Sequence, residues 1–191
     1  MRIIFLLTIP LFFVVSCQQN NTPRPRAYFR IALPEKAYQT FDSAYPYRFE
    51  HPAYSSFAPD TRETAEPYWA DIVFPAFLGR VHLSYKEVED REQLRGYFDD
   101  ARTFVHRHIP KATAIHEEII THGENQVYGV LFHIRGKEAA SPLQFYATDS
   151  VSHFLRGALY FDVTPNNDSL APVIGFFEED IRHLFATLQW E

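Results

Sequence analysis

The stretch QVYGVLFHIR, residues 126–135, decides the fold, and two stretches of the same kind follow it at 142–148 and 155–163. Apolar residues occupy alternate positions along it, as expected of a β-strand, which places successive side chains on opposite faces. The second face also carries apolar residues, Val127 and Leu131. Strands that are apolar on both faces indicate a sheet that is covered on both sides.

Outward from this stretch, the same alternation predicts further strands separated by turns that contain Gly, Asn, Asp or Pro. The strands at 68–74 and 81–85 are close enough in sequence to form a hairpin. We expect strands at 28–33, 47–50, 68–74, 81–85, 113–121, 126–135, 142–148 and 155–163.

Two segments have the apolar spacing of amphipathic helices. Asp90 is placed to cap the first helix, with Gln93 as its capping-box partner. Asp168 or Ser169 is placed to cap the second helix, with Pro172 in the first turn. The order of elements predicts a single α+β domain, in which an antiparallel sheet of about six strands is flanked by two main helices. This arrangement resembles the sandwich fold of the Mog1 and PsbP group.

The composition is that of a globular protein with an aromatic core. Of the 191 residues, 46% are hydrophobic and 22% are charged, and 18 Phe and 11 Tyr stand against one Met. The formal net charge of −6 argues against a nucleic-acid partner, which requires a clustered basic face. The single cysteine excludes an intramolecular disulfide, so the core alone must hold the domain together.

The N-terminus has the pattern of a bacterial lipoprotein signal peptide. Arg2 precedes an apolar run over 3–15, which is too short to remain as a transmembrane helix. The run ends in Val14-Val15-Ser16-Cys17, which fits the lipobox; an ordinary signal peptide with a chance cysteine is the alternative. We expect a signal peptide over 1–16, a lipidated leader over 17–27 and one globular domain over 28–191.

Lipidation of Cys17 predicts membrane attachment through acyl chains such as palmitate, because two or more chains anchor a protein stably. Gln18 follows the cysteine where an Asp signals retention in the inner membrane of well-studied enterobacteria. This favours the outer membrane. The chain has no acidic run after Cys17, which favours the periplasmic side. The inner membrane stays open as an alternative.

The nine histidines prompt a test for metal sites. His106 and His108 lie two residues apart near a helix end, where their side chains diverge. His116 begins a stretch that resembles a zinc-protease motif but has Ile where the second histidine must be. We therefore predict no metal site and no cofactor.

A catalytic triad is the other candidate for histidine chemistry. Asp149, Ser150, Ser152 and His153 are crowded together in sequence, but no Gly-x-Ser-x-Gly elbow accompanies them. Adjacency in sequence does not create the geometry of a triad. The sequence therefore predicts that the protein is not an enzyme.

Three Asp-Ser pairs resemble an O-glycosylation signal that some gliding and gut bacteria use on exported proteins. The alternative, which we favour, is that these pairs cap helices and form turns. The three candidate acceptors are Ser43, Ser150 and Ser169.

Several stretches together resemble the GldD family of gliding-motility lipoproteins. The likeness covers essentially the whole chain after the lipobox and keeps the order of the motifs. Ala27 and Ala32 depart from the pattern, where we expect a glycine and an acidic residue. The stretches are 23–36 (PRPRAYFRIALPEK), 83–86 (LSYK), 153–161 (HFLRGALYF) and 168–174 (DSLAPVI), followed by Asp180, Ile181 and Trp190.

The resemblance implies an envelope protein that is required for gliding and associated with the type IX secretion machinery, with no known enzyme activity or cofactor. Its partners are then the membrane and other envelope proteins of the gliding and secretion machinery. The candidate contact residues are Arg24, Arg26, Tyr28 and Arg30, because Arg and Tyr are favoured at interfaces. Alternatively, Tyr28 and Arg30 only pack the first strand against its neighbour.

Two other functions stay open. A periplasmic carrier of a small ligand requires an apolar pocket with convergent polar groups. An envelope hydrolase requires a Ser–His contact or paired carboxylates in a cleft.

Overall fold

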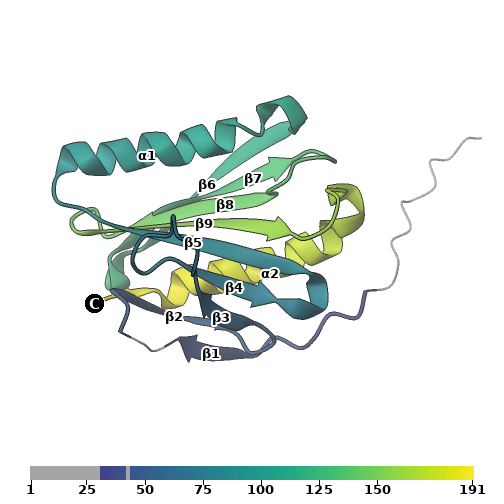
Figure 1. The fold of residues 1–191 in the computed structure, drawn as a ribbon, viewed down its shortest axis with the longest axis horizontal. Helices are drawn as coiled ribbons and strands as arrows, with labels where there is room; N and C mark the ends of the chain where they lie inside the picture. Colours follow the sequence, from purple (N-terminus) through teal and green to yellow (C-terminus); the bar gives the residue numbers. More distant parts are fainter. Residues whose placement is uncertain (1–30, 42–43) are drawn as a thin grey trace, which may run out of the picture.

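The computed structural model describes residues 31–41 and 44–191, and its largest element is an antiparallel sheet of seven strands (Figure 1). Every neighbouring pair in this sheet is antiparallel. In spatial order the strands are β3 (Ser56–Pro59), β4 (Ala70–Phe74), β5 (Gly79–Glu87), β9 (His153–Phe161), β8 (Leu143–Thr148), β7 (Val127–Arg135) and β6 (Ala114–His122).

A second sheet of three strands joins the two ends of the described chain. β2 (Tyr47–Pro52) lies between β1 (Tyr38–Phe41) and β10 (Gln189–Trp190) and pairs with both of them antiparallel. The hydroxyl of the fully buried Tyr47 donates to the carbonyl of Tyr68 at 2.7 Å. The C-terminal residues are therefore part of the folded domain.

Two long helices and three short 3₁₀ helices complete the fold of the described residues. In α1 (Arg91–His106), Asp90 accepts from the amides of Glu92 and Gln93, as predicted. The Gln93 side chain accepts from the amide of Glu89 rather than from that of Asp90. The remaining helices are α2 (Asn167–Thr187), η1 (Pro75–Phe77), η2 (Ile109–Lys111) and η3 (Gly123–Asn125).

The start of α2 corrects the sequence prediction. The helix begins at Asn167, before the expected caps, and its N-cap residue Asn166 makes no side-chain capping hydrogen bond. Pro172 therefore lies inside the helix instead of in its first turn. The Asn167 side chain donates to the carbonyls of Gly136 and Ala139, both at 2.9 Å. These contacts hold the helix start to the β7–β8 connection and explain why the helix begins early.

The two helices cover opposite faces of the large sheet (Figure 1). On β7, Val130 and Phe132 belong to the apolar cluster that packs on α1. Val127 and Leu131, on the other face of the same strand, belong to the cluster that packs on α2. The predicted α+β class and the sheet covered on both sides are confirmed.

The N-terminal part of the described chain differs from the prediction. Residues 31–37 form no regular structure, so the strand expected over 28–33 is wrong for its described residues 31–33. β3 is a strand that the sequence analysis did not predict. β4 begins at Ala70 rather than at 68, because Tyr68 has a left-handed backbone with φ of 65°.

Among the residues that the structure describes, no helix has both the length and the apolar character needed to cross a membrane.

Candidate functional site

The first described segment of the chain is fastened to α2 by a lysine. Residues 31–37 have no regular structure, and within them Lys36 reaches the helix. Its ammonium group donates to Oδ1 of Asp180 and to the carbonyl of Phe176, both at 2.6 Å. The same group lies 3.4 Å from the centre of the Phe176 ring, which adds a cation–π contact.

Asp180 is the buried centre of this arrangement, with only 4% of its surface exposed. Besides Lys36, it accepts hydrogen bonds from the hydroxyls of Tyr54 at 2.5 Å and Tyr38 at 3.0 Å. Burial, together with the neighbouring Asp180, raises the pKa of both tyrosines. A buried carboxylate is tolerated when a counter-charge and hydrogen bonds replace water, and here all of these are present. We call these four residues with Phe176 the leader junction.

Sequence reasoning missed the leader junction, although one signal could have revealed it. Asp180 lies three residues after Phe177 and four before Leu184, within the apolar stripe of α2. A charged residue in such a stripe is buried and needs a partner. The identity of that partner could not be inferred, because Lys36 is 144 residues away in sequence.

Most of the site residues predicted from the sequence lie outside the part of the chain that the structure describes. The other two predicted residues, Ser150 and Ser169, are exposed, the first in the β8–β9 turn and the second in the first turn of α2. The residues outside the described part are Cys17, Arg24, Arg26, Tyr28, Arg30 and Ser43.

The turn before β9 gives Asp149 a structural role. Its Oδ1 accepts from the amides of Val151, Ser152 and His153, each at 2.9 Å. The Nδ1 atom of His153 lies 2.8 Å from the hydroxyl of Tyr85. The contacts of Asp149 favour turn formation as the role of this Asp-Ser pair.

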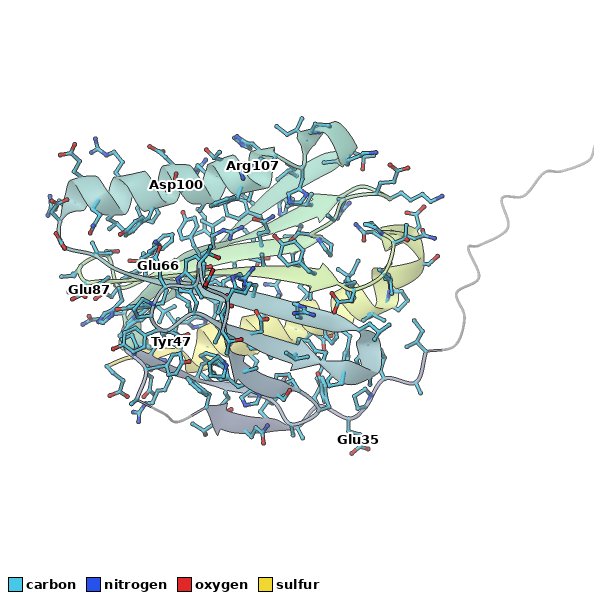
Figure 2. The ribbon with its side chains drawn as sticks, in the orientation of Figure 1. Glu35, Tyr47, Glu66, Glu87, Asp100 and Arg107 are labelled. Atoms are coloured by element: carbon cyan, nitrogen blue, oxygen red, sulfur yellow. The ribbon has the colours of Figure 1, made fainter. Side chains whose placement is uncertain are left out.

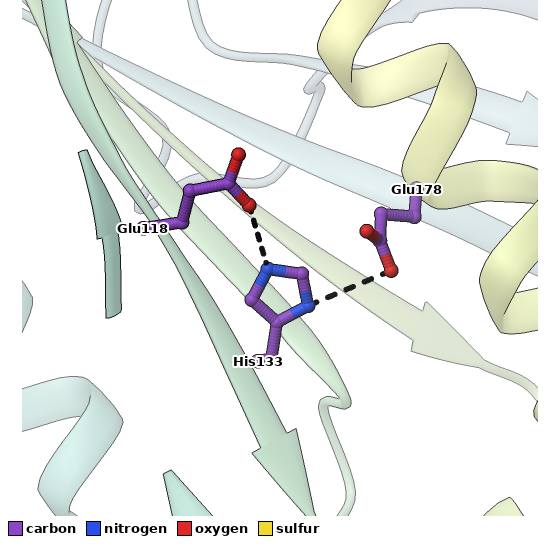
Figure 3. A group of neighbouring side chains, drawn as sticks. All are labelled: Glu118, His133 and Glu178. Carbon is purple, nitrogen blue, oxygen red and sulfur yellow. Dashed lines mark hydrogen bonds and ion pairs between the residues drawn. The ribbon is translucent and has the colours of Figure 1, made fainter. Parts of the chain in front are cut away.

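A second polar group joins β6, β7 and α2 (Figure 3). His133 on β7 lies between two carboxylates, with Nε2 3.2 Å from Glu118 of β6 and Nδ1 3.5 Å from Glu178 of α2. One ligand-type atom from each residue lies within 4.8 Å of the others, a spacing that a metal ion could use. Sequence reasoning did not bring these three residues together, because they come from three separate elements.

The ion pairs of Arg182 bear on whether Glu118, His133 and Glu178 can bind a metal ion. Its guanidinium makes two hydrogen bonds to Glu118 and a third, at 2.8 Å, to Glu178. These contacts, with a smaller contribution from His133, lower the pKa of Glu118 to about 2. Because a metal ion would have to displace this cation from both carboxylates, the arrangement favours an ion-pair network that holds α2 to the sheet.

In the described part of the chain, a Ser–His contact joins the buried residues His51 and Ser55. The Nδ1 atom of His51 lies 2.8 Å from the Ser55 hydroxyl, which itself donates to the carbonyl of Pro52 at 2.7 Å. His51 therefore acts as the donor of the pair instead of as a base. Burial lowers the pKa of His51, which keeps its ring neutral. The pair joins the end of β2 to the β2–β3 connection, and its hydrogen bonds do not fit a nucleophile activated by a base.

The other histidines tested from the sequence do not converge. His106 is exposed at the end of α1, while His108 lies 2.9 Å from the side-chain amide nitrogen of Gln144. His116 is exposed on β6, with its ring centre 5.8 Å from that of His133. Their positions agree with the predicted divergence of His106 and His108.

A cleft of about 620 Å³ opens beside the His133 network, between the end of β7 and the start of α2. Its walls include the apolar residues Ile134, Leu143 and Ile174 and the charged residues Arg135 and Lys137. Its size falls within the range of small-molecule sites.

The fold and the leader junction define an α+β domain whose first described segment is fastened to its C-terminal helix. The chain belongs to the family described as gliding motility lipoprotein GldD, whose model matches residues 18–190. It is also similar to the solution structure of cyanobacterial PsbP (CyanoP) from Synechocystis sp. PCC 6803, with 10% identity, a TM-score of 0.49, and coverage of 85% of this chain and 98% of that one. No curated protein matches the chain.

Proposed function

We propose that this protein is an envelope lipoprotein that acyl chains on Cys17 hold at the membrane. In this proposal it is required for gliding motility and supports the assembly or stability of the gliding motor and the type IX secretion machinery. It acts by protein–protein contacts and not by catalysis. Membership of the GldD family supports the lipoprotein and gliding parts of this proposal.

The leader junction is the structural observation that carries the mechanism. A flexible connection would let a tethered domain rotate freely, whereas a buried ion pair fixes where the leader leaves the domain. Lys36 is held by Asp180, by a backbone carbonyl of α2 and by a ring, so the junction fixes the point at which the chain leaves the domain beside this helix. A fixed exit point brings partners of the leader to the same side of the domain each time.

The leader and the residues beside it are the proposed contact surface. Arg24, Arg26, Tyr28 and Arg30 come shortly before the fixed Lys36, so partners would meet them next to the domain. We place the protein at the outer membrane, facing the periplasm, because Gln18 stands where a retention signal would be.

The experiment that tests this function is a strain whose only copy carries Cys17→Ala. We expect loss of colony spreading and a changed profile of secreted proteins, while the protein is still made and folded. The matched control is Gln18→Ala, which alters the neighbouring residue and keeps the acylated cysteine. Normal gliding and secretion in the Cys17→Ala strain would show that the anchor is dispensable and would overturn the proposal.

A further inference from the structure

A second cleft, of about 340 Å³, lies between α1 and the face of β5 and β9 that is turned towards this helix. We call it the α1 cleft. Figure 2 shows Asp100 along α1 and Glu66 on the segment that leads to β4. This segment supplies another wall of the cleft through Arg62 and Trp69. Aromatic side chains from three parts of the chain line the cleft: Trp69, Tyr97, Phe104 and Phe154.

Arg156 of β9 is the partly buried cation of this cleft. Its guanidinium donates to the side-chain oxygen of Gln144 at 2.8 Å and stacks 4.3 Å from the centre of the Phe104 ring. Among the residues that the structure describes, no carboxylate forms an ion pair with it. Burial lowers the pKa of Arg156, and the neighbouring Tyr160 side chain offsets part of this effect.

A second cation shares the same ring. The guanidinium of Arg107, at the end of α1, lies 4.8 Å from the centre of Phe104. Within the described part of the chain it also has no carboxylate partner, and its charge further lowers the pKa of Arg156. Two like charges around one ring repel each other, and a bound anion would relieve this repulsion.

The other basic side chains that line the α1 cleft have acidic partners. Lys86 pairs with Glu66, and Arg62 pairs with Asp60. His82 lies 2.7 Å from Asp71. Within the described residues, the lining then keeps two charges without an ion-pair partner, the guanidinium of Arg156 and the carboxylate of Asp100. Arg107 lies outside the lining, on the Phe104 ring, and adds the one positive charge that remains.

We propose that the α1 cleft binds a monocarboxylate that is attached to a flat apolar body. The guanidinium fork matches the two oxygens of a carboxylate, and the single remaining charge matches one negative charge better than the two of a phosphate. The aromatic walls supply contact area for the apolar body, and the volume fits a ligand of small size.

This site goes beyond the proposed function. The α1 cleft lies on the α1 face of the sheet, whereas the leader junction lies on α2, on the opposite face. Failure of ligand binding would therefore leave the anchored role untouched, and failure of the anchor test would leave the ligand site untouched. The carboxylate could come from a small organic acid or from an acidic side chain next to an aromatic residue in a peptide.

The test uses the lipidated protein in a nonionic detergent, with Trp190→Phe as the background. The chain has two tryptophans, so the tryptophan fluorescence of this variant comes from Trp69 in the cleft alone. The probes are 3-phenylpropionate, its neutral amide, inorganic phosphate, and a Phe-Glu dipeptide with blocked ends. Calorimetry confirms each change in fluorescence.

We expect 3-phenylpropionate to bind and its amide to bind at least tenfold more weakly. Arg107→Gln should weaken binding of the acid, but less than Arg156→Gln, because the variant removes a positive charge beside the cleft and not one in its lining. Arg156→Gln should abolish binding, and Phe104→Ala, at a partly exposed position, should weaken it without risk to the core. Arg135→Gln, which removes an exposed arginine on β7, is the matched control and should change binding less than twofold.

Binding of the blocked dipeptide at least as tightly as 3-phenylpropionate would identify a peptide as the source of the carboxylate, and weaker binding would identify a small acid. Three results would overturn the assignment: equal binding of acid and amide, tighter binding of phosphate, or an equal loss of affinity in Arg135→Gln.

Discussion

The Nζ atom of Lys36 lies 2.6 Å from Oδ1 of Asp180, across 144 residues of sequence. The lysine belongs to a segment without regular structure, and the aspartate lies in the middle of the longest helix. This pair links the start of the domain to its core by side chains alone.

Lys36→Met should destabilise the domain by about 1–3 kcal/mol, because the buried carboxylate of Asp180 loses its cation. The free energy of unfolding in urea measures the change. Glu179→Gln is the control, since its exposed carboxylate lies 3.8 Å from the same lysine and contributes little. An equal loss of stability in both variants would contradict the central role of Asp180.

Glu118 should make folding stability sensitive to acid. Its pKa is lowered from 4.5 to about 2 in the folded protein, mainly by Arg182. The folded state therefore binds this proton less readily than the unfolded state. The resulting stability is present above pH 4.5 and is lost as the pH falls towards 2.

Glu118→Gln should flatten this acid-dependent part of the stability curve, which unfolding measured at a series of pH values would reveal. The control is Glu117→Gln on the same strand, whose carboxylate makes only an exposed contact with Arg102 at 3.5 Å. The attribution to Glu118 fails if the slope between pH 2 and 4.5 is the same in the wild type and in Glu118→Gln.

Gly157→Ala should cost about 1–3 kcal/mol, because a Cβ atom at this position would overlap the ring of Phe145 on the neighbouring strand. Gly175→Ala is the opposite case. Apart from the glycine, its chain neighbours and the adjacent helix backbone, no described atom lies within 4 Å of its added Cβ, and alanine favours a helix, so we expect a gain of up to about 1 kcal/mol. Thermal unfolding of both variants measures the contrast, which a stable Gly157→Ala protein would contradict.

Zn²⁺ should leave the melting temperature of the wild type within about 1 °C, because Arg182 already occupies the carboxylates of Glu118 and Glu178. Calorimetric scans with Zn²⁺ and with EDTA provide the measurement. Arg182→Gln is the informative variant, since it removes the competing cation and keeps the three potential ligands. A large stabilisation of the wild type by Zn²⁺ would instead identify a metal centre.

The sequence by itself determined the local elements and the class of the fold. Alternating apolar residues located β7 and showed that both of its faces are covered, because the side-chain period of a strand is a local property. The cap at Asp90 could also be predicted from the sequence, since its hydrogen bonds reach only three residues along the chain. The resemblance to the GldD family also came from short stretches of sequence, and the family match confirms it.

Only the tertiary structure decided which distant residues meet. Alternation predicted a strand through Ile31, but the segment from there to residue 37 is held to α2 by the side chain of Lys36 and forms no strand. Glu118 and Arg182 meet because β6 and α2 pack together, and Arg107 and Arg156 share the Phe104 ring because α1 crosses β9. Such contacts depend on packing between separate elements, which a pattern along one stretch of chain does not encode.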